Sequence, residues 1–174
     1  MDAVEIVKKG IRDVPDFPKK GIIFKDITTL LNDPHLFDLT VSLYSKAAKD
    51  IEVDYVAGIE SRGFIFGSVL ASTLGCGFVP IRKPGKLPAN VYSESYELEY
   101  GTDTVEIHQD AVKKGSNVLI VDDLLATGGT ALASAKLIEK CGARVTALHF
   151  LIELTFLGGI NKLNNYTVKT FIQF

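Results

Sequence analysis

One stretch of the chain constrains its fold more than any other: VLIVDDLLATGGT, residues 118–130. Four apolar, strand-forming residues run into two adjacent aspartates, and a loop of small residues with two glycines follows. A continuous apolar strand is typical of a parallel sheet that is covered on both faces. In such sheets, ligands bind beyond the carboxyl ends of the strands, which is where this loop begins. The stretch therefore predicts an α/β fold and a binding site at one edge of its sheet.

The rest of the chain alternates between strand and helix patterns. DYVAGI, GFVPIR and RVTALHFLIEL read as further strands, TVEIH is a weaker candidate, and helical spacing of apolar residues separates several of them. Helices are expected over SRGFIFGSVLASTLG, closed by Gly75, and over GTALASAKLIEKCG, closed by Gly142. This order predicts a mainly parallel, twisted sheet with helices on both faces.

The N-terminal part shows two more helix signals. Residues 3–12 fit a short amphipathic helix, and Asp33 followed by proline fits the start of a helix that runs to about Lys49. Between them, the prolines and glycine of PDFPKKGIIFKD predict a loop. At 174 residues, the whole chain, 1–174, is expected to form a single domain. Residues 83–103 are expected to form a long, functional or mobile loop.

Composition excludes several classes of function. The formal net charge of only -2 does not suggest a nucleic-acid surface. No apolar run approaches 18 residues and the N-terminus has no signal-peptide pattern, so we expect a soluble, cytoplasmic protein with no membrane contact. The two cysteines, Cys76 and Cys141, stand apart from each other and from the histidines, which favours free buried thiols over a disulfide or zinc site.

The loop at residues 126–130 has the chemistry of a phosphate site. Its glycines let the backbone approach an anion, its threonines add hydroxyl donors, and the following helix directs its N-terminal dipole there. An ordinary capped turn remains an alternative for these residues alone. Asp122 and Asp123 would repel a phosphate unless they face another part of the same ligand, and vicinal ribose hydroxyls fit them. Because side chains alternate along a strand, one of the two acids can instead support the site from behind.

Five segments together resemble the adenine phosphoribosyltransferases, type I enzymes that use 5-phosphoribosyl 1-pyrophosphate (PRPP). They are VLIVDDLLATGGT, PDFPKKGIIFKDIT, AGIESRGFIFG, IRKPGKLP and YELEYG, and they span about residues 12 to 158. The resemblance implies transfer of the phosphoribosyl group from PRPP to adenine, giving AMP and pyrophosphate in purine salvage. It also implies Mg²⁺ on the diphosphate, a homodimer, a base-binding segment at about 12–30 and a flexible loop at about 83–103 over the active site.

The resemblance assigns roles to individual residues. In relatives the first loop holds the 5′-phosphate and the acidic pair holds the ribose, while basic residues near two other strand ends hold pyrophosphate. One of these cations reaches the neighbouring subunit's site in related enzymes. For the three basic residues that follow GFVPI, solvated surface charge is the alternative. The implied sets are Ala126, Thr127, Gly128, Gly129 and Thr130 for the 5′-phosphate, Asp122 and Asp123 for the ribose, and Ser61, Arg62, Arg82, Lys83 and Lys86 for the pyrophosphate.

The base site and the general acid come from other segments. Main-chain groups of Ile23 and Lys25 are implied to pair with the adenine edge, while Ile23 and Leu154 cover its faces. Phe24 lines the same pocket or belongs to the core. Relatives often carry arginine where this chain has Lys25, and another basic residue where it has Pro84.

The resemblance places the catalysts in YELEYG. In 6-oxopurine relatives an aspartate occupies the position of Ala126, and alanine has no proton to give. Glu99, with Tyr100 beside it, is therefore the implied acid and base, although a solvated loop glutamate is the ordinary alternative. A non-catalytic, PRPP-sensing regulator of the same fold and a receiver-type signalling domain are the competing classes. Neither a GxxxxGK[ST] nor a GxGxxG pattern is present, which disfavours ATPases and dinucleotide enzymes.

Overall fold

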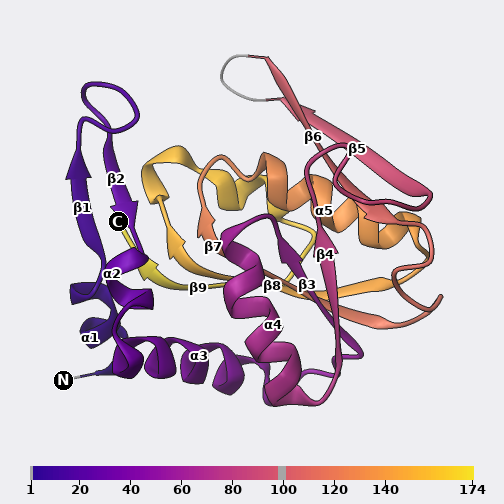
Figure 1. The fold of residues 1–174 in the computed structure, drawn as a ribbon, viewed down its shortest axis with the longest axis horizontal. Coiled ribbons are helices and arrows are strands. Elements are labelled where there is room, and N and C mark those ends of the chain that lie inside the picture. Colours follow the sequence, from indigo (N-terminus) through magenta and orange to yellow (C-terminus); the bar gives the residue numbers. More distant parts are fainter. Residues whose placement is uncertain (1, 98–100) are drawn as a thin grey trace. The chain divides into compact units, whose positions relative to one another are not determined.

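The structure, a computed structural model, describes residues 2–97 and 101–174 of the chain. Its contacts divide the chain into two compact units, Met1–Lys46 and Ala47–Phe174. Each unit is described by itself. The larger one contains the main sheet and both of the strand-to-helix turns predicted to bind anions (Figure 1).

The smaller unit combines helices with a two-stranded antiparallel sheet. The expected helices are confirmed, and Asp33 caps one of them by accepting hydrogen bonds from the N–H groups of His35 at 2.9 Å and Leu36 at 3.1 Å. The expectation of a continuous loop was wrong, since the end of PDFPKKGIIFKD pairs with the residues before it as a β-hairpin. The elements are α1 (Ala3–Lys9), β1 (Arg12–Pro15), β2 (Ile23–Asp26), α2 (Thr28–Leu31) and α3 (Pro34–Ala48), the last of which begins here.

The larger unit is built on a five-stranded sheet of order β4-β3-β7-β8-β9. Every neighbouring pair in it is parallel, as the apolar strands predicted. Strand β3 pairs directly with β7, and β7 continues to Leu125 beyond the last paired residue, Val121. The elements are β3 (Tyr55–Ile59), α4 (Arg62–Leu74), β4 (Gly77–Ile81), β7 (Asn117–Leu125), α5 (Gly129–Lys140), β8 (Arg144–Glu153), η1 (Thr155–Leu157), η2 (Gly159–Leu163) and β9 (Val168–Gln173).

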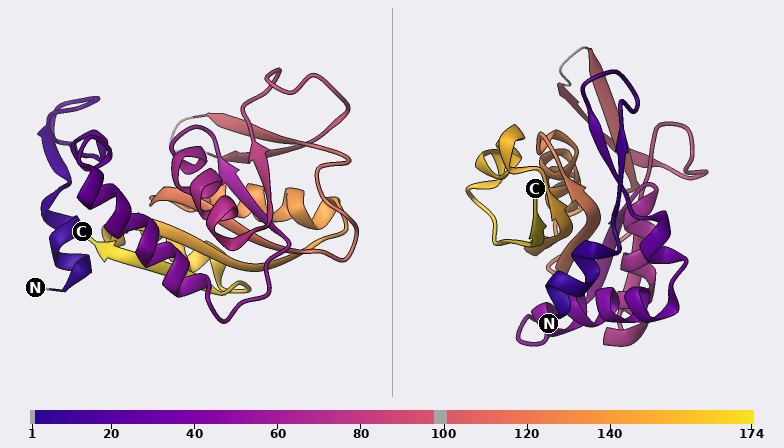
Figure 2. Two further views of the ribbon diagram at one scale, coloured as in Figure 1. Left: turned by 60° about the horizontal axis from the view of Figure 1, so that its bottom comes forward. Right: turned by 90° about the vertical axis from the view of Figure 1, so that its left-hand side faces the viewer.

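Helices α4 and α5 cover opposite faces of this sheet. A methyl group added to Gly67 of α4 would meet Phe78, Gly58 and Val56, which share one face. Ala57, between the last two, instead belongs to the core cluster that includes the buried residues of α5. Because side chains alternate across a strand, the two helices lie on different sides (Figure 2). In the part of the chain that the structure describes, no helix combines the length and apolarity needed to cross a membrane.

Residues 83–103 are not one continuous loop. Strand β5 (Val91–Glu97) lies within this segment and forms an antiparallel hairpin with β6 (Thr102–His108). Tyr92, Glu94 and Tyr96 are less exposed than the serines between them, so β5 has the alternation of a half-buried strand. Its buried face carries polar side chains, which concealed the strand from a pattern based on apolar residues. The weaker candidate TVEIH is confirmed as a strand by β6.

His149 on β8 predicts a pH-dependent stability. Its side chain is buried, its Nδ1 has no hydrogen-bond partner, and its ring meets Phe171 edge-on at 6.2 Å. Burial, and then the charge of Lys169, lower its pKa to about 4 from 6.5. A histidine held neutral stabilises the fold above pH 6.5, and this contribution is lost as the pH falls towards 4. The free energy of unfolding should therefore drop by about 2 kcal/mol more between pH 7 and pH 5 than in His149→Leu.

Urea unfolding at the two pH values measures this difference. His35→Gln, which replaces an exposed histidine, is the matched control. Equal pH dependence in wild type and His149→Leu would show that His149 is not the titrating group.

Candidate active site at the carboxyl edge of the sheet

The loop between β7 and α5 has the form of an anion cradle. Strand β7 continues past the aspartates to Leu125, and the chain then turns through Gly128, whose φ of +77° belongs to the left-handed region. The first N–H groups of α5 have no acceptor within the helix. Residues of this loop and the strand enclose a cavity of about 80 Å³, which suits a phosphate group rather than a whole nucleotide. The cavity is lined by Asp122, Leu124, Leu125, Ala126, Thr127, Gly128, Thr130, Ala131 and Phe150.

The two aspartates have different surroundings, as alternation along a strand requires. Asp122 lines the cavity, and its Oδ1 accepts a hydrogen bond from the N–H of Asp123 at 2.9 Å. Desolvation, and then the charge of Asp123, raise the pKa of Asp122 well above its ordinary value. Asp123 is buried and forms an ion pair with Arg62. The pair is therefore one acid in the cavity and one acid that holds an arginine.

Gly159 braces the cradle from behind, and sequence reasoning missed it. A Cβ on Gly159 would lie 2.1 Å from the carbonyl oxygen of Ala126 and 2.8 Å from the nitrogen of Gly128. Conversely, a Cβ on Gly128 would lie 2.4 Å from the carbonyl oxygen of Gly159. The backbones of the loop and of η2 thus touch directly. Two consecutive glycines shortly after the last long strand were the only signal in the sequence.

The turn after β3 is the second predicted anion site. The Glu60–Ser61 peptide bond is cis, and helix α4 starts at Arg62. Gly63 lies so close to β7 that an added Cβ would be 2.6 Å from the carbonyl oxygen of Val121 and 3.0 Å from Oδ1 of Asp122. The turn after β3 therefore lies against the two aspartates of β7, Asp122 of which also lines the cavity beside the second turn, and Arg62 pairs with Asp123.

Glu60 fastens the basic residues after β4 to this turn. Its carboxylate accepts hydrogen bonds from Nε and Nη2 of Arg82 at 3.2 and 3.3 Å, and from the N–H of Lys83 at 2.8 Å. The Lys83 hydrogen bond, with the help of Arg82, lowers the pKa of Glu60 although burial opposes this. Arg82 also donates from Nη1 to the carbonyl of Lys86 at 3.1 Å. The structure thus brings together the predicted Ser61, Arg62, Arg82, Lys83 and Lys86 at one edge, with Glu60 as an organiser that the sequence did not single out.

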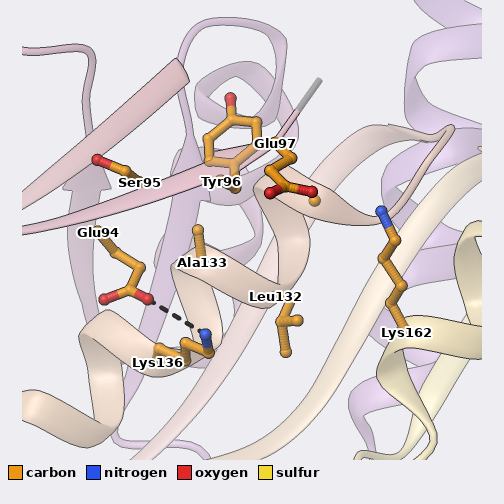
Figure 3. A pocket seen from close by; sticks show the side chains of 9 residues that line it. Glu94, Ser95, Tyr96, Glu97, Leu132, Ala133, Lys136 and Lys162 are labelled. Carbon is orange, nitrogen blue, oxygen red and sulfur yellow. Dashed lines mark hydrogen bonds and ion pairs between the residues drawn. The ribbon is translucent and has the colours of Figure 1, made fainter. Parts of the chain in front are cut away.

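The β5–β6 hairpin reaches the start of α5. A Cβ on Gly129 would lie 2.9 Å from the ring of Tyr96 and 3.4 Å from the carbonyl oxygen of Glu97. A second cavity of about 300 Å³ lies between β5 and α5, and Figure 3 shows Tyr96 and Glu97 on its hairpin side and Lys136 bonded to Glu94. The hairpin therefore leaves no room for a side chain at Gly129.

The residues predicted for adenine occupy two elements. Ile23, Phe24 and Lys25 are consecutive on β2, where Ile23 is 55% exposed and Phe24 meets the Phe17 ring edge-on at 5.2 Å. Lys25 donates to Oδ1 of Asp13 at 2.7 Å. Leu154 follows β8, and its N–H bonds to the carbonyl oxygen of Leu125 at 3.0 Å. Phe24 is not fully buried, so its alternative role as a core residue is only partly met.

The predicted catalysts Glu99 and Tyr100 lie outside the described residues. Glu97 and Gly101, which flank the gap, are described and belong to or adjoin the hairpin. Among residues 2–97 and 101–174, no group of three or more His, Cys, Asp or Glu side chains is arranged to hold a metal ion. Cys76 and Cys141 are free thiols, partly exposed rather than buried as predicted.

Replacing each aspartate by asparagine should change stability in opposite directions. Because folding raises the pKa of Asp122, its carboxylate destabilises the fold at neutral pH, and Asp122→Asn should raise the melting temperature. Asp123→Asn should lower it, because Arg62 loses a charged partner worth about 1.5 to 3 kcal/mol at most. Thermal unfolding at pH 7.5 measures both variants. Shifts of the same sign would contradict the two environments described above.

Comparison with known proteins gives these turns a context. Residues 26–160 match the phosphoribosyl transferase domain family. Adenine phosphoribosyltransferase of Thermoanaerobacter sp. (strain X514) is 56% identical over 171 residues, which cover 98% of this chain and 99% of that protein. The crystal structure of adenine phosphoribosyltransferase from Thermoanaerobacter pseudethanolicus superposes with a TM-score of 0.96 at 56% identity, covering 98% of this chain and 99% of that one.

A more distant structure has ligands in its site. Adenine phosphoribosyltransferase from Saccharomyces cerevisiae, complexed with D-2,5-dideoxy-2,5-imino-altritol 1,6-bisphosphate and adenine, has a TM-score of 0.92 at 42% identity, and the match covers 97% of this chain and 98% of that one. The ligands of that complex are a bisphosphate and a purine base. The chain belongs to the phosphoribosyltransferase family and, within it, to the adenine phosphoribosyltransferases.

Proposed function

We propose that the chain transfers the phosphoribosyl group of PRPP to adenine at the carboxyl edge of its sheet, giving AMP and pyrophosphate. The observation that carries this assignment is the adjacency of two anion-binding turns, one after β3 and one after β7. The cavity beside Ala126–Thr130 receives the 5′-phosphate, where free N–H groups and the dipole of α5 stabilise negative charge. Asp122, in the same cavity, accepts hydrogen bonds from the ribose hydroxyls, with Asp123 behind it.

The second turn receives the pyrophosphate. Ser61 and Arg62 open α4, and Lys83 is fastened beside them by the Glu60 carboxylate. These groups neutralise the charge that grows on the leaving group as the anomeric carbon becomes cationic. Positioning and charge stabilisation supply the rate, and no covalent nucleophile is needed. Arg82 and Lys86 complete the cationic rim.

Adenine is held by the segment around β2 and by Leu154. The exposed Ile23 side chain offers an apolar surface for one face of the base, with Phe24 beside it, and the main chain of Ile23 and Lys25 offers edge partners. From the larger unit, the resemblance to the family supports Leu154 as a second apolar contact with adenine. Glu99 donates a proton to N7 of adenine during AMP cleavage and removes it during AMP synthesis. Tyr100 is proposed to act beside it, near the reacting groups.

Magnesium fits this site as part of the substrate. The donor set consists of cations and two aspartates in different surroundings, and the described residues form no metal cage. Such a set fits Mg²⁺ that is held mainly by diphosphate oxygens and water. Bound magnesium would supply positive charge to the leaving diphosphate, and the residues of the two turns would orient that diphosphate.

The assembly and location follow the family. We propose a homodimer in the cytoplasm that works in purine salvage, with adenine and PRPP as its partners and without nucleic acid or membrane. A non-catalytic PRPP sensor is not favoured, since the relatives at more than 50% identity are adenine phosphoribosyltransferases over almost their whole length.

Pyrophosphate release tests the activity. The protein is mixed with Mg²⁺, PRPP and, in turn, adenine, hypoxanthine, guanine or orotate. Pyrophosphate is expected to be released with adenine and not with hypoxanthine, guanine or orotate. Release with none of the four bases, from protein that still binds PRPP, would instead support the sensor.

A further inference from the structure

The side chain of Lys83 is held on the hairpin, although its backbone belongs to the pyrophosphate turn. Its ammonium forms an ion pair with Asp103 of β6 and a hydrogen bond of 3.2 Å with the hydroxyl of Tyr96. The Tyr96 hydroxyl in turn donates to Asp103 at 3.0 Å. The N–H of Lys83, by contrast, donates to Glu60 at 2.8 Å. Lys83 thus connects the turn after β3 with the hairpin.

Three cations of the predicted pyrophosphate site have carboxylate partners in this structure. Arg62 is paired with Asp123 and Arg82 with Glu60, both from the sheet edge itself. Lys83 differs because its partner comes from the hairpin. Both members of the Lys83–Asp103 pair are open to solvent, with 38% of the Lys83 side chain and 32% of the Asp103 side chain exposed.

Exchange of partners is easier for Lys83 than for Arg82. Arg82 is fixed by bonds from three nitrogens to Glu60 and to the Lys86 carbonyl. Lys83 carries a point charge on a flexible stem, which can swing without breaking backbone contacts. A diphosphate, with several negative charges, attracts an ammonium more strongly than one half-exposed carboxylate does.

We propose that Asp103 is a placeholder anion: it holds Lys83 until a diphosphate arrives, and the diphosphate then takes the lysine over. This inference rests on the proposed function, in which Lys83 is a pyrophosphate ligand. Asp103 is a positioning residue that never touches the substrate. Asp103 lowers the affinity for diphosphate, because every diphosphate that binds must first break the Lys83–Asp103 pair. In the empty site, Asp103 keeps Lys83 charged and ordered.

Burial and charge support a stable resting pair. Burial by itself would lower the pKa of Lys83, but hydrogen bonds with Asp103 and Tyr96 outweigh it and raise the pKa. Asp103 Oδ1 is additionally anchored by the N–H of Thr104 at 2.8 Å. Asparagine at this position keeps an Oδ1 acceptor for Thr104 and replaces Oδ2, which accepts from Lys83 and Tyr96, with an uncharged amide donor.

Calorimetric titration with magnesium pyrophosphate and with PRPP tests the proposal in a double-mutant cycle of Asp103→Asn and Lys83→Gln. Asp103→Asn should tighten pyrophosphate binding about three- to tenfold, the scale of one partly screened ion pair, and lower the KM for PRPP without changing that for adenine. Lys83→Gln should weaken binding, and Asp103→Asn should have no further effect in its presence. Glu94→Gln is the control. It removes an equal charge from the same hairpin, but Glu94 pairs with Lys136 and Lys140, so this variant should bind pyrophosphate as wild type does.

Each other result overturns the proposal. Unchanged or weaker binding by Asp103→Asn would make Asp103 a support of the site rather than a competitor, and equal tightening by Glu94→Gln would reduce the effect to overall charge. Unchanged binding by Lys83→Gln would remove Lys83 from the site while the proposed function stands, provided that wild type binds PRPP. Wild type that binds neither ligand would remove both proposals. Asp103→Ser serves if Asp103→Asn does not fold, as judged by circular dichroism.

Discussion

Replacing Glu99 by glutamine is expected to slow the chemical step by about 10²- to 10⁴-fold, the range for one positioned proton-transfer group. This corresponds to about 3 to 5 kcal/mol of barrier, far more than a screened surface charge contributes. Glutamine keeps the size and polarity of the side chain, so PRPP affinity should stay nearly normal. Single-turnover kinetics at saturating substrates measure the step itself, because product release often limits steady-state turnover.

Glu97→Gln is the matched control for Glu99→Gln. Glu97 lies two residues earlier in the sequence, at the end of β5, and its replacement removes an equal charge. The control should retain the wild-type single-turnover rate. A loss of less than about tenfold in Glu99→Gln would fall short of the expected range and return Glu99 to the role of a solvated loop residue.

Gly159→Ala is expected to weaken PRPP binding by about 10- to 100-fold, the scale of overpacking at a tight contact. The added Cβ would lie 2.1 Å from the carbonyl oxygen of Ala126, a backbone atom that can yield only if the phosphate cradle moves. Gly159 is not among the residues that line the 80 Å³ cavity. The effect should therefore appear as loss of affinity, measured by calorimetry on protein whose circular dichroism spectrum is native.

Gly158→Ala separates this clash from general backbone strain. Gly158 has a φ of +62°, and a Cβ there would meet only the Asn161 side chain at 3.3 Å. Alanine at this position carries the cost of the left-handed conformation, about 1 kcal/mol, without touching the cradle. PRPP affinity should stay within a few-fold of wild type. Equal losses in both variants would argue against the brace.

The sequence was sufficient for the sheet and for both turns because their signals are local. A continuous apolar strand followed by small residues defines β7 and its loop, and Gly75 and Gly142 end their helices with φ of +69° and +78°. Asp33 caps its helix as its sequence position indicated. In each case the physical cause lies within a few residues of the feature.

The features that escaped prediction depend on contacts between distant segments. Gly159 matters because its backbone meets Gly128, 31 positions earlier by their numbering. Glu60 matters because Arg82 and Lys83 arrive beside it from the next strand. Strand β5 was missed because its inward face carries Tyr92, Glu94 and Tyr96, which are polar or amphipathic, although the two tyrosines pack against the apolar core. No pattern read along the chain contains these partners.

The direct pairing of β3 with β7 fixes the distance between these two strands. Neighbouring strands lie about 4.8 Å apart, a spacing set by main-chain hydrogen bonds that no side-chain substitution can stretch. The backbone therefore fixes the distance between the two turns. In the proposed function, this distance sets the span between the two phosphorylated ends of the sugar. In the proposed function, the contacts with the base come from other segments, around β2 and at Leu154. A chain of this design can therefore change the base that it accepts during evolution, while the distance between the two turns stays the same.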